Sequence, residues 1–87
     1  MPNVDAEDIY KRVRKILARM VKLKESAVTL EAHLRDDLGV DSVDIWDIMT
    51  KMEEEFDIDV EEGDAAGVET VQDVVNIVKS KMKAAKK

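Results

Sequence analysis

Ser42 is the residue of this chain whose type and position best suit it to carry a chemical modification. It follows Asp41 at the start of an expected helix over residues 41–56, so its hydroxyl lies in the first turn. The backbone amides of a first turn have no partner inside the helix, and they favour negative charge attached to that hydroxyl. An isolated Asp-Ser pair is more often an ordinary helix start, in which the serine is the N-cap. The surrounding sequence has to decide between these interpretations.

Other residues with reactive side chains lack the partners that their chemistry requires. His33 is the one histidine and has no recognisable nucleophile beside it, so the sequence favours a protein that is not an enzyme. Asp57 and Asp59 begin a pattern similar to a calcium-binding EF-hand loop. Glu62 and Val68 stand where that loop requires Gly and Glu, so we expect no metal site. The absence of cysteine excludes disulfides and thiolate catalysis.

Length and composition predict one small helical domain over residues 1–87. The core is expected over about residues 4–82, with a lysine-rich tail over 83–87. Apolar residues are 45% of the chain, and with one proline and three glycines the composition favours an all-α fold. No apolar run approaches the roughly 20 residues that cross a bilayer. The first twenty residues are too charged for a secretory signal, so we expect a cytoplasmic protein.

Hydrophobic periodicity predicts a four-helix bundle with a short third helix and a long loop between helices one and two. The expected helices lie at about residues 5–22, 41–56 and 61–66, and from the capping box Thr70-x-x-Asp73 onward. The loop over residues 24–41 has spaced apolar anchors and no sustained helical period. We expect one helical turn in it, near residues 31–34.

The expected second helix has two distinct apolar surfaces when its residues are placed at roughly 100° intervals from Ser42. The wider stripe, expected to be core together with Val75 and Val78 of the last helix, consists of Ile45, Ile48, Met49, Met52 and Phe56. The smaller patch consists of Val43, Trp46 and Thr50, flanked by Asp47, Glu53 and Glu54. A tryptophan on the surface beside acidic residues is typical of a partner-binding site.

Acidic residues are concentrated in the middle of the chain. Residues 36–73 contain fifteen acids and one base, a net charge of −14, whereas residues 1–35 carry +3 and residues 74–87 carry +5. Such a segment repels nucleic acid and anionic membranes, and it attracts basic protein surfaces. Because this self-repulsion opposes folding, we expect the acidic surface to face a partner.

The residues around Ser42 form part of a longer motif. The chain reads Asp37-Leu38-Gly39-Val40-Asp41-Ser42-Val43, then Glu53-Glu54-Glu55-Phe56, then Thr70-Val71-Gln72-Asp73. This arrangement resembles the acyl carrier proteins, which have D-x-G-x-D-S and then Leu or Val at the start of the second helix and E-E-E-F at its end. The resemblance covers about residues 4–82 and indicates a discrete carrier of the bacterial type.

The resemblance implies that Ser42 carries a 4′-phosphopantetheine arm whose thiol holds acyl groups as thioesters. We expect Asp41 either to orient Ser42 or to help hold a metal while a separate transferase loads the arm. The implied partners are a phosphopantetheinyl transferase and acyl-transferring enzymes with basic docking patches, acting in fatty-acid or specialised lipid or polyketide biosynthesis on a monomeric carrier. The docking residues are then Val43, Asp44, Trp46, Asp47, Thr50, Glu53 and Glu54, with Asp44 included through the resemblance. The residues that line an acyl cleft are then Ile45, Ile48, Met49, Met52, Phe56, Val75 and Val78.

Some residues depart from the family pattern. Fatty-acid carriers usually have a small aliphatic residue where this chain has Trp46, and often Met where it has Thr50. Lys51, Glu61 and Gly63 also differ from the residues common in that family. A specialised pathway is therefore as consistent with the sequence as general fatty-acid synthesis. The alternative function is a small acidic helical adaptor that binds a basic partner without covalent modification. The adaptor predicts that Ser42→Ala leaves function intact, whereas a carrier requires the hydroxyl.

Overall fold

Four α-helices and one short 3-10 helix make up the computed structural model, which describes residues 6–85 and the side chains of residues 8–82. The α-helices are α1 (Ala6–Val21), α2 (Ser42–Phe56), α3 (Glu62–Ala66) and α4 (Val71–Ala85). The all-α prediction and the short third helix are confirmed. Residues 83–85 of the expected lysine-rich tail continue α4, and Lys86 and Lys87 lie outside the described residues.

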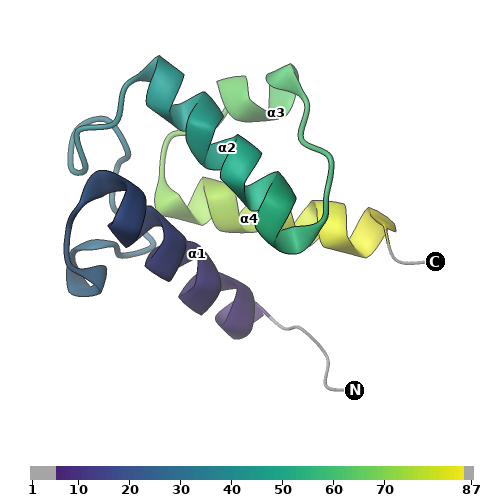
Figure 1. The fold of residues 1–87 in the computed structure, drawn as a ribbon, viewed down its shortest axis with the longest axis horizontal. Coiled ribbons are helices and arrows are strands. Elements are labelled where there is room, and N and C mark those ends of the chain that lie inside the picture. Colours follow the sequence, from purple (N-terminus) through teal and green to yellow (C-terminus); the bar gives the residue numbers. More distant parts are fainter. Residues whose placement is uncertain (1–5, 86–87) are drawn as a thin grey trace.

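The three long helices share one hydrophobic core. Helix α1 packs on α4, α2 contacts both of them, and α3 lies on the far side of α2 from α1 (Figure 1). Every residue of the predicted core stripe is buried in it, namely Ile45, Ile48, Met49, Met52, Phe56, Val75 and Val78. Helix α1 contributes Ile9, Val13 and Leu17, also buried. Burial of these aliphatic side chains is the main force that holds the helices together.

The long loop between α1 and α2 is held by hydrogen bonds to the start of α4. Leu34 N donates to Glu69 O at 2.8 Å, and Val71 N donates to Ala32 O at 3.1 Å. The prediction of a helical turn near residues 31–34 was wrong. Backbone groups there pair with residues 69–71, and His33 forms an isolated antiparallel bridge with Thr70. The 3-10 helix lies earlier in the loop instead, at Glu25–Ala27.

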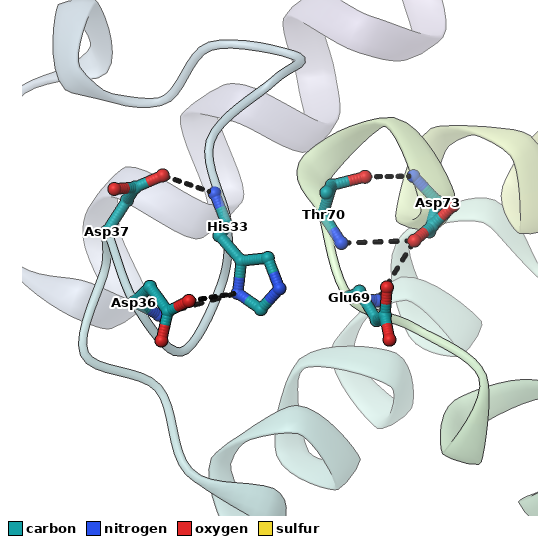
Figure 2. Close-up of polar contacts among 6 residues, drawn as sticks. All are labelled: His33, Asp36, Asp37, Glu69, Thr70 and Asp73. Carbon is teal, nitrogen blue, oxygen red and sulfur yellow. Dashed lines mark hydrogen bonds and ion pairs between the residues drawn. The ribbon is translucent and has the colours of Figure 1, made fainter.

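The start of α4 has the capping box that the sequence predicts. Asp73 Oδ2 accepts hydrogen bonds from Glu69 N at 3.0 Å and from Thr70 N at 3.1 Å, and Asp73 N donates to Thr70 Oγ1 at 3.3 Å (Figure 2). In the facing loop, Asp37 Oδ2 accepts from His33 N at 2.7 Å. Two carboxylates therefore organise the two backbone segments that the bridge joins.

We expect Asp73→Ala to lower the free energy of unfolding by about 1–2 kcal/mol, because it removes the acceptor of two backbone amides at the start of α4. Urea unfolding at neutral pH measures this loss. Gln72→Ala is the matched control, since Gln72 is exposed and its side-chain amide donates a hydrogen bond to Asn76 Oδ1 on the same helix at 3.0 Å. Equal losses in the two variants would show that the capping box does not stabilise the fold.

Candidate functional site

Ser42 is the first residue of α2, and its hydroxyl is exposed at the helix N-terminus. Asp41 is the N-cap: its Oδ1 accepts a hydrogen bond from Asp44 N at 3.0 Å. The interpretation of Ser42 as an ordinary N-cap is therefore wrong, since the preceding residue has that role. The Ser42 hydroxyl is thus available at a helix end where free amides favour an anion.

Arg35 contacts the Ser42 hydroxyl directly. Its Nη2 donates to Ser42 Oγ at 2.7 Å, although the two residues are seven positions apart. The chain between them folds back on itself, because Val40 N donates to Leu34 O at 2.8 Å and Gly39 N donates to Arg35 O at 3.2 Å. Gly39 has a φ of 70°, in the left-handed region that glycine adopts readily. This turn carries the guanidinium to the start of α2.

Sequence reasoning missed Arg35 because the contact depends on how the loop turns. The one sequence signal is its position, as the last base before the acidic residues 36–73. That signal locates a charge along the chain and does not show which side chain it meets. The acids that neighbour Arg35 in sequence have contacts of their own, as with Asp37 on the His33 amide.

A groove between α2 and α3 opens beside Ser42. Its volume is about 580 Å³, and its lining consists of Arg35, Ser42, Ile45, Trp46, Glu62, Gly63, Ala65, Ala66 and Val68. The buried residues of this set are apolar, whereas Ser42, Arg35 and Glu62 are exposed. Small side chains on α3 leave the space open. The groove therefore combines an apolar wall with polar groups, a composition suited to a flexible chain that has a polar root.

One of the seven residues expected to line an acyl cleft borders this groove, Ile45. Ile48 borders a separate cavity of about 380 Å³ with Asp44 and Asp47, on another side of α2. The remaining five are enclosed in the core among α1, α2 and α4, and they are Met49, Met52, Phe56, Val75 and Val78. They lie behind Ile45 because the wide apolar stripe of α2 faces the other long helices.

Of the seven residues of α2 expected to dock a partner, five are exposed and two, Thr50 and Glu53, are half-buried. Val43 is 70% exposed and Trp46 is 43% exposed, with Trp46 at the groove. Asp44 and Asp47 are exposed on the side of the second cavity. The half-buried Thr50 donates its hydroxyl hydrogen to Trp46 O at 3.0 Å and so stays close to its own helix.

Two acidic residues near the end of α2 have different contacts. Glu54 is exposed and lies 3.9 Å from the ammonium of Lys51, an exposed pair that contributes little to stability. Glu53 is half-buried, and its Oε2 accepts a hydrogen bond from Val60 N at 2.8 Å. Glu53 therefore holds the segment that leads to α3. Its position in the sequence, as one of the acids that flank the small apolar patch of α2, did not predict this contact.

An ion pair fixes α3, which forms one wall of the groove, to α4. Asp64 Oδ2 lies 3.0 Å from Lys81 Nζ and accepts a hydrogen bond from Glu61 N at 3.1 Å. The Glu61 amide, and then the Lys81 ammonium, hold the pKa of Asp64 below its usual 3.8. The hydrogen bond to Asp64 raises the pKa of Lys81 above its usual 10.5. Because α3 has only five residues, this tether contributes to the position of the wall.

The described residues contain no cluster of three or more histidine or acidic side chains arranged to hold a metal ion. Among the helices of the described residues, none has both the length and the apolar character needed to cross a membrane. The candidate site therefore rests on the hydroxyl, the neighbouring guanidinium and the groove.

Comparison with known proteins points to one family. The family model described as a phosphopantetheine attachment site matches residues 11–78. An acyl carrier protein of Borrelia garinii subsp. bavariensis is 36% identical over 78 residues, which cover 90% of this chain and 98% of that protein. The crystal structure of an acyl carrier protein from Thermotoga maritima has a TM-score of 0.81 at 22% identity, covering 93% of this chain and 94% of that one, a likeness of fold.

We expect Asp64→Asn to lower the thermal unfolding midpoint at pH 7 and to have no effect at the most acidic pH. The folded pKa of Asp64 lies below 3.8, so its carboxylate stabilises the fold fully above that value and progressively less as the pH falls through the folded pKa. Thermal unfolding of both proteins from pH 7 down to pH 2 measures the difference. A difference that is independent of pH would contradict the ionic role of Asp64.

Proposed function

The chain belongs to the acyl carrier protein family, and on this premise we propose that Ser42 is the residue that carries its phosphopantetheine. The observation that supports the assignment is the exposed Ser42 hydroxyl at the start of α2, with capping performed by Asp41. Ser42 lies inside residues 11–78, the range that matches the phosphopantetheine attachment family. When attached, the group supplies a thiol that holds acyl groups as thioesters. The protein is a carrier and not a catalyst.

The residues around Ser42 fit a phosphodiester. The helix end offers backbone amides, and Asp41 keeps the first turn closed by binding Asp44 N. Ser42 Oγ accepts a hydrogen bond from Arg35, so an anion attached to this oxygen forms beside a cation. A transferase that approaches Ser42 meets an exposed first turn. We assign to Asp41 the role of orienting Ser42 through the helix start.

We propose that the groove between α2 and α3 shelters the acyl cargo. Ser42 and Ile45 both border it, so a chain rooted at Ser42 begins beside an apolar wall. Longer cargo would have to part the core behind Ile45, where Met49 and Met52 are fully buried. Methionine is unbranched and adapts its shape, so these positions suit a core that opens around a guest. The other cleft residues of the proposal are Ile48, Phe56, Val75 and Val78.

Partner enzymes are proposed to dock on the outward side of α2. Val43 and Trp46 supply exposed apolar area beside Ser42, and Asp47 and Glu54 supply negative charge along the same helix. The −14 charge of residues 36–73 steers basic surfaces toward this side. The partners are a phosphopantetheinyl transferase and acyl-transferring enzymes with basic patches, and the carrier acts as a monomer.

The proposed pathway is fatty-acid synthesis or a specialised lipid or polyketide route. Trp46 stands at the groove and on the docking side at once, so its bulk affects both cargo and partner. This position favours a carrier adapted to particular enzymes. The alternative of an unmodified acidic adaptor has no support from the comparisons, because the matching family is defined by phosphopantetheine attachment.

Incubation with coenzyme A, Mg²⁺ and a broad-specificity phosphopantetheinyl transferase is expected to add the mass of one phosphopantetheine to the wild-type chain. Ser42→Ala is expected to gain nothing, because it lacks the oxygen that forms the ester. Ser80→Ala is the matched control, as Ser80 is exposed on α4, and it should gain the same mass as wild type. Intact-mass spectrometry reads all three, and a modified Ser42→Ala protein would refute the assignment.

Charge reversal on the docking side should slow the same transferase. We expect Asp47→Lys combined with Glu54→Lys to lower kcat/KM by about tenfold at low salt, since steering by surface charge acts on the association rate. The difference should shrink as salt rises to about 0.5 M, where exposed charges are screened. Glu31→Lys, which reverses an exposed acid in the long loop, changes the net charge as much as Asp47→Lys alone does and is the control for that single reversal. Equal losses of kcat/KM from charge reversal in the loop and on α2 would contradict a docking site on α2.

A further inference from the structure

The guanidinium of Arg35 donates a hydrogen bond to the hydroxyl of Ser42, the residue proposed for modification. Arg35 Nη2 lies 2.7 Å from Ser42 Oγ. Among the residues whose side chains the structure describes, no carboxylate lies within ion-pair distance of Arg35, although the segment that follows it is strongly acidic. A guanidinium beside many acids ordinarily pairs with one of them. This one contacts a neutral oxygen instead.

The acids closest to Arg35 in sequence are engaged with other groups. Asp37 Oδ2 accepts from the His33 amide at 2.7 Å, and Asp36 lies 3.7 Å from His33 Nδ1 (Figure 2). Asp41, beside Ser42, accepts from Asp44 N. Asp37 and Asp41 thus bind backbone amides, and the carboxylate of Asp36 lies near the His33 ring. The guanidinium is therefore left for Ser42.

Attachment of the arm changes the charge at this contact. The neutral hydroxyl becomes a phosphodiester with one negative charge, and the phosphorus is bonded to the same oxygen that Arg35 contacts. The new anion forms within the acidic region of the chain, where it is repelled. A guanidinium is planar and has five donors, of which the contact with Ser42 Oγ uses one. Paired donors of this kind match the oxygens of a phosphate.

We propose that Arg35 binds the phosphodiester on Ser42 and directs the root of the arm to the groove between α2 and α3. Both residues line that groove together with Trp46, so an arm held by Arg35 starts at the groove. The proposal rests on the proposed function, because it requires a phosphodiester at Ser42. Arg35 is a positioning residue for the attached group, and it takes no part in acyl transfer.

The first test follows the Arg35 side chain in the loaded carrier by NMR. Loading of wild type, verified by mass, should shift the Nε–Hε resonance of Arg35 more than that of any other arginine. The phosphorus resonance should differ between loaded wild type and loaded Arg35→Gln. An Arg35 resonance that does not move in a fully loaded protein would overturn the proposal. Failure of wild type to gain mass would instead refute the attachment at Ser42.

The second test measures the coupling between Arg35 and the phosphodiester. Thermal midpoints are compared before and after loading in wild type, Arg35→Gln, Arg35→Lys and Arg19→Gln. Arg19 is exposed on α1 and does not line the groove, so it controls for loss of one positive charge. We expect loading to lower the midpoint of Arg35→Gln by about 1 to 5 °C more than that of wild type or Arg19→Gln, as for an exposed ion pair in a small domain.

Arg35→Lys separates the charge from the shape of the guanidinium. The change of its thermal midpoint on loading should lie between those of wild type and Arg35→Gln, because an ammonium retains the charge and lacks the paired donors of a guanidinium. Comparison of loaded with unloaded protein within each variant removes any effect on the fold itself. Equal changes on loading in wild type and Arg35→Gln would show that the contact with Ser42 is lost when the arm is attached, and the proposal would be wrong.

Discussion

The exposure of the Ser42 hydroxyl depends on the cap at the start of α2. Asp41 accepts the hydrogen bond from Asp44 N and fixes the residue at which the helix begins. If Ser42 were the N-cap instead, its hydroxyl would be turned toward the backbone amides of its own first turn. With the observed start, Ile45 turns into the core while Ser42 stays outside. The apolar stripe of α2 sets which face is buried, and the cap on Asp41 leaves the Ser42 hydroxyl free of the amides of its own helix.

The groove depends on a second constraint, which is that a five-residue helix has to be held in place by other elements. Glu53 binds the Val60 amide in the segment before α3, and Asp64 on α3 binds Lys81 on α4. The first contact holds the segment before α3 and the second holds α3 itself, while its small side chains leave space against α2. Burial of Ala65 on α3, and of Val60 and Val68 in the flanking segments, adds apolar contact with the core.

Sequence periodicity predicted the helices and the buried face of α2, because both depend on residues three and four positions apart. It did not predict the bridge between His33 and Thr70, which depends on residues far apart in the chain. Arg35 was missed for the same reason, since its contact with Ser42 requires the turn at Gly39. The residues expected to line an acyl cleft were chosen by their apolar type, and which of them borders a groove depends on where α3 lies.

The acidic residues of the middle segment divide by what they contact. Four carboxylates accept a hydrogen bond from a backbone amide at a helix start or in a loop, and so they stabilise the fold. They are Asp41, Glu53, Asp64 and Asp73. The side chains of Asp44 and Asp47 have no hydrogen bond or ion pair among the described residues, yet they lie exposed on the helix that begins with Ser42. Mutual repulsion among acids opposes folding. Asp44 lies in the first turn of α2, where the helix dipole favours an acid, whereas Asp47 lies beyond it. We propose that the charge of both residues also attracts a basic partner toward Ser42.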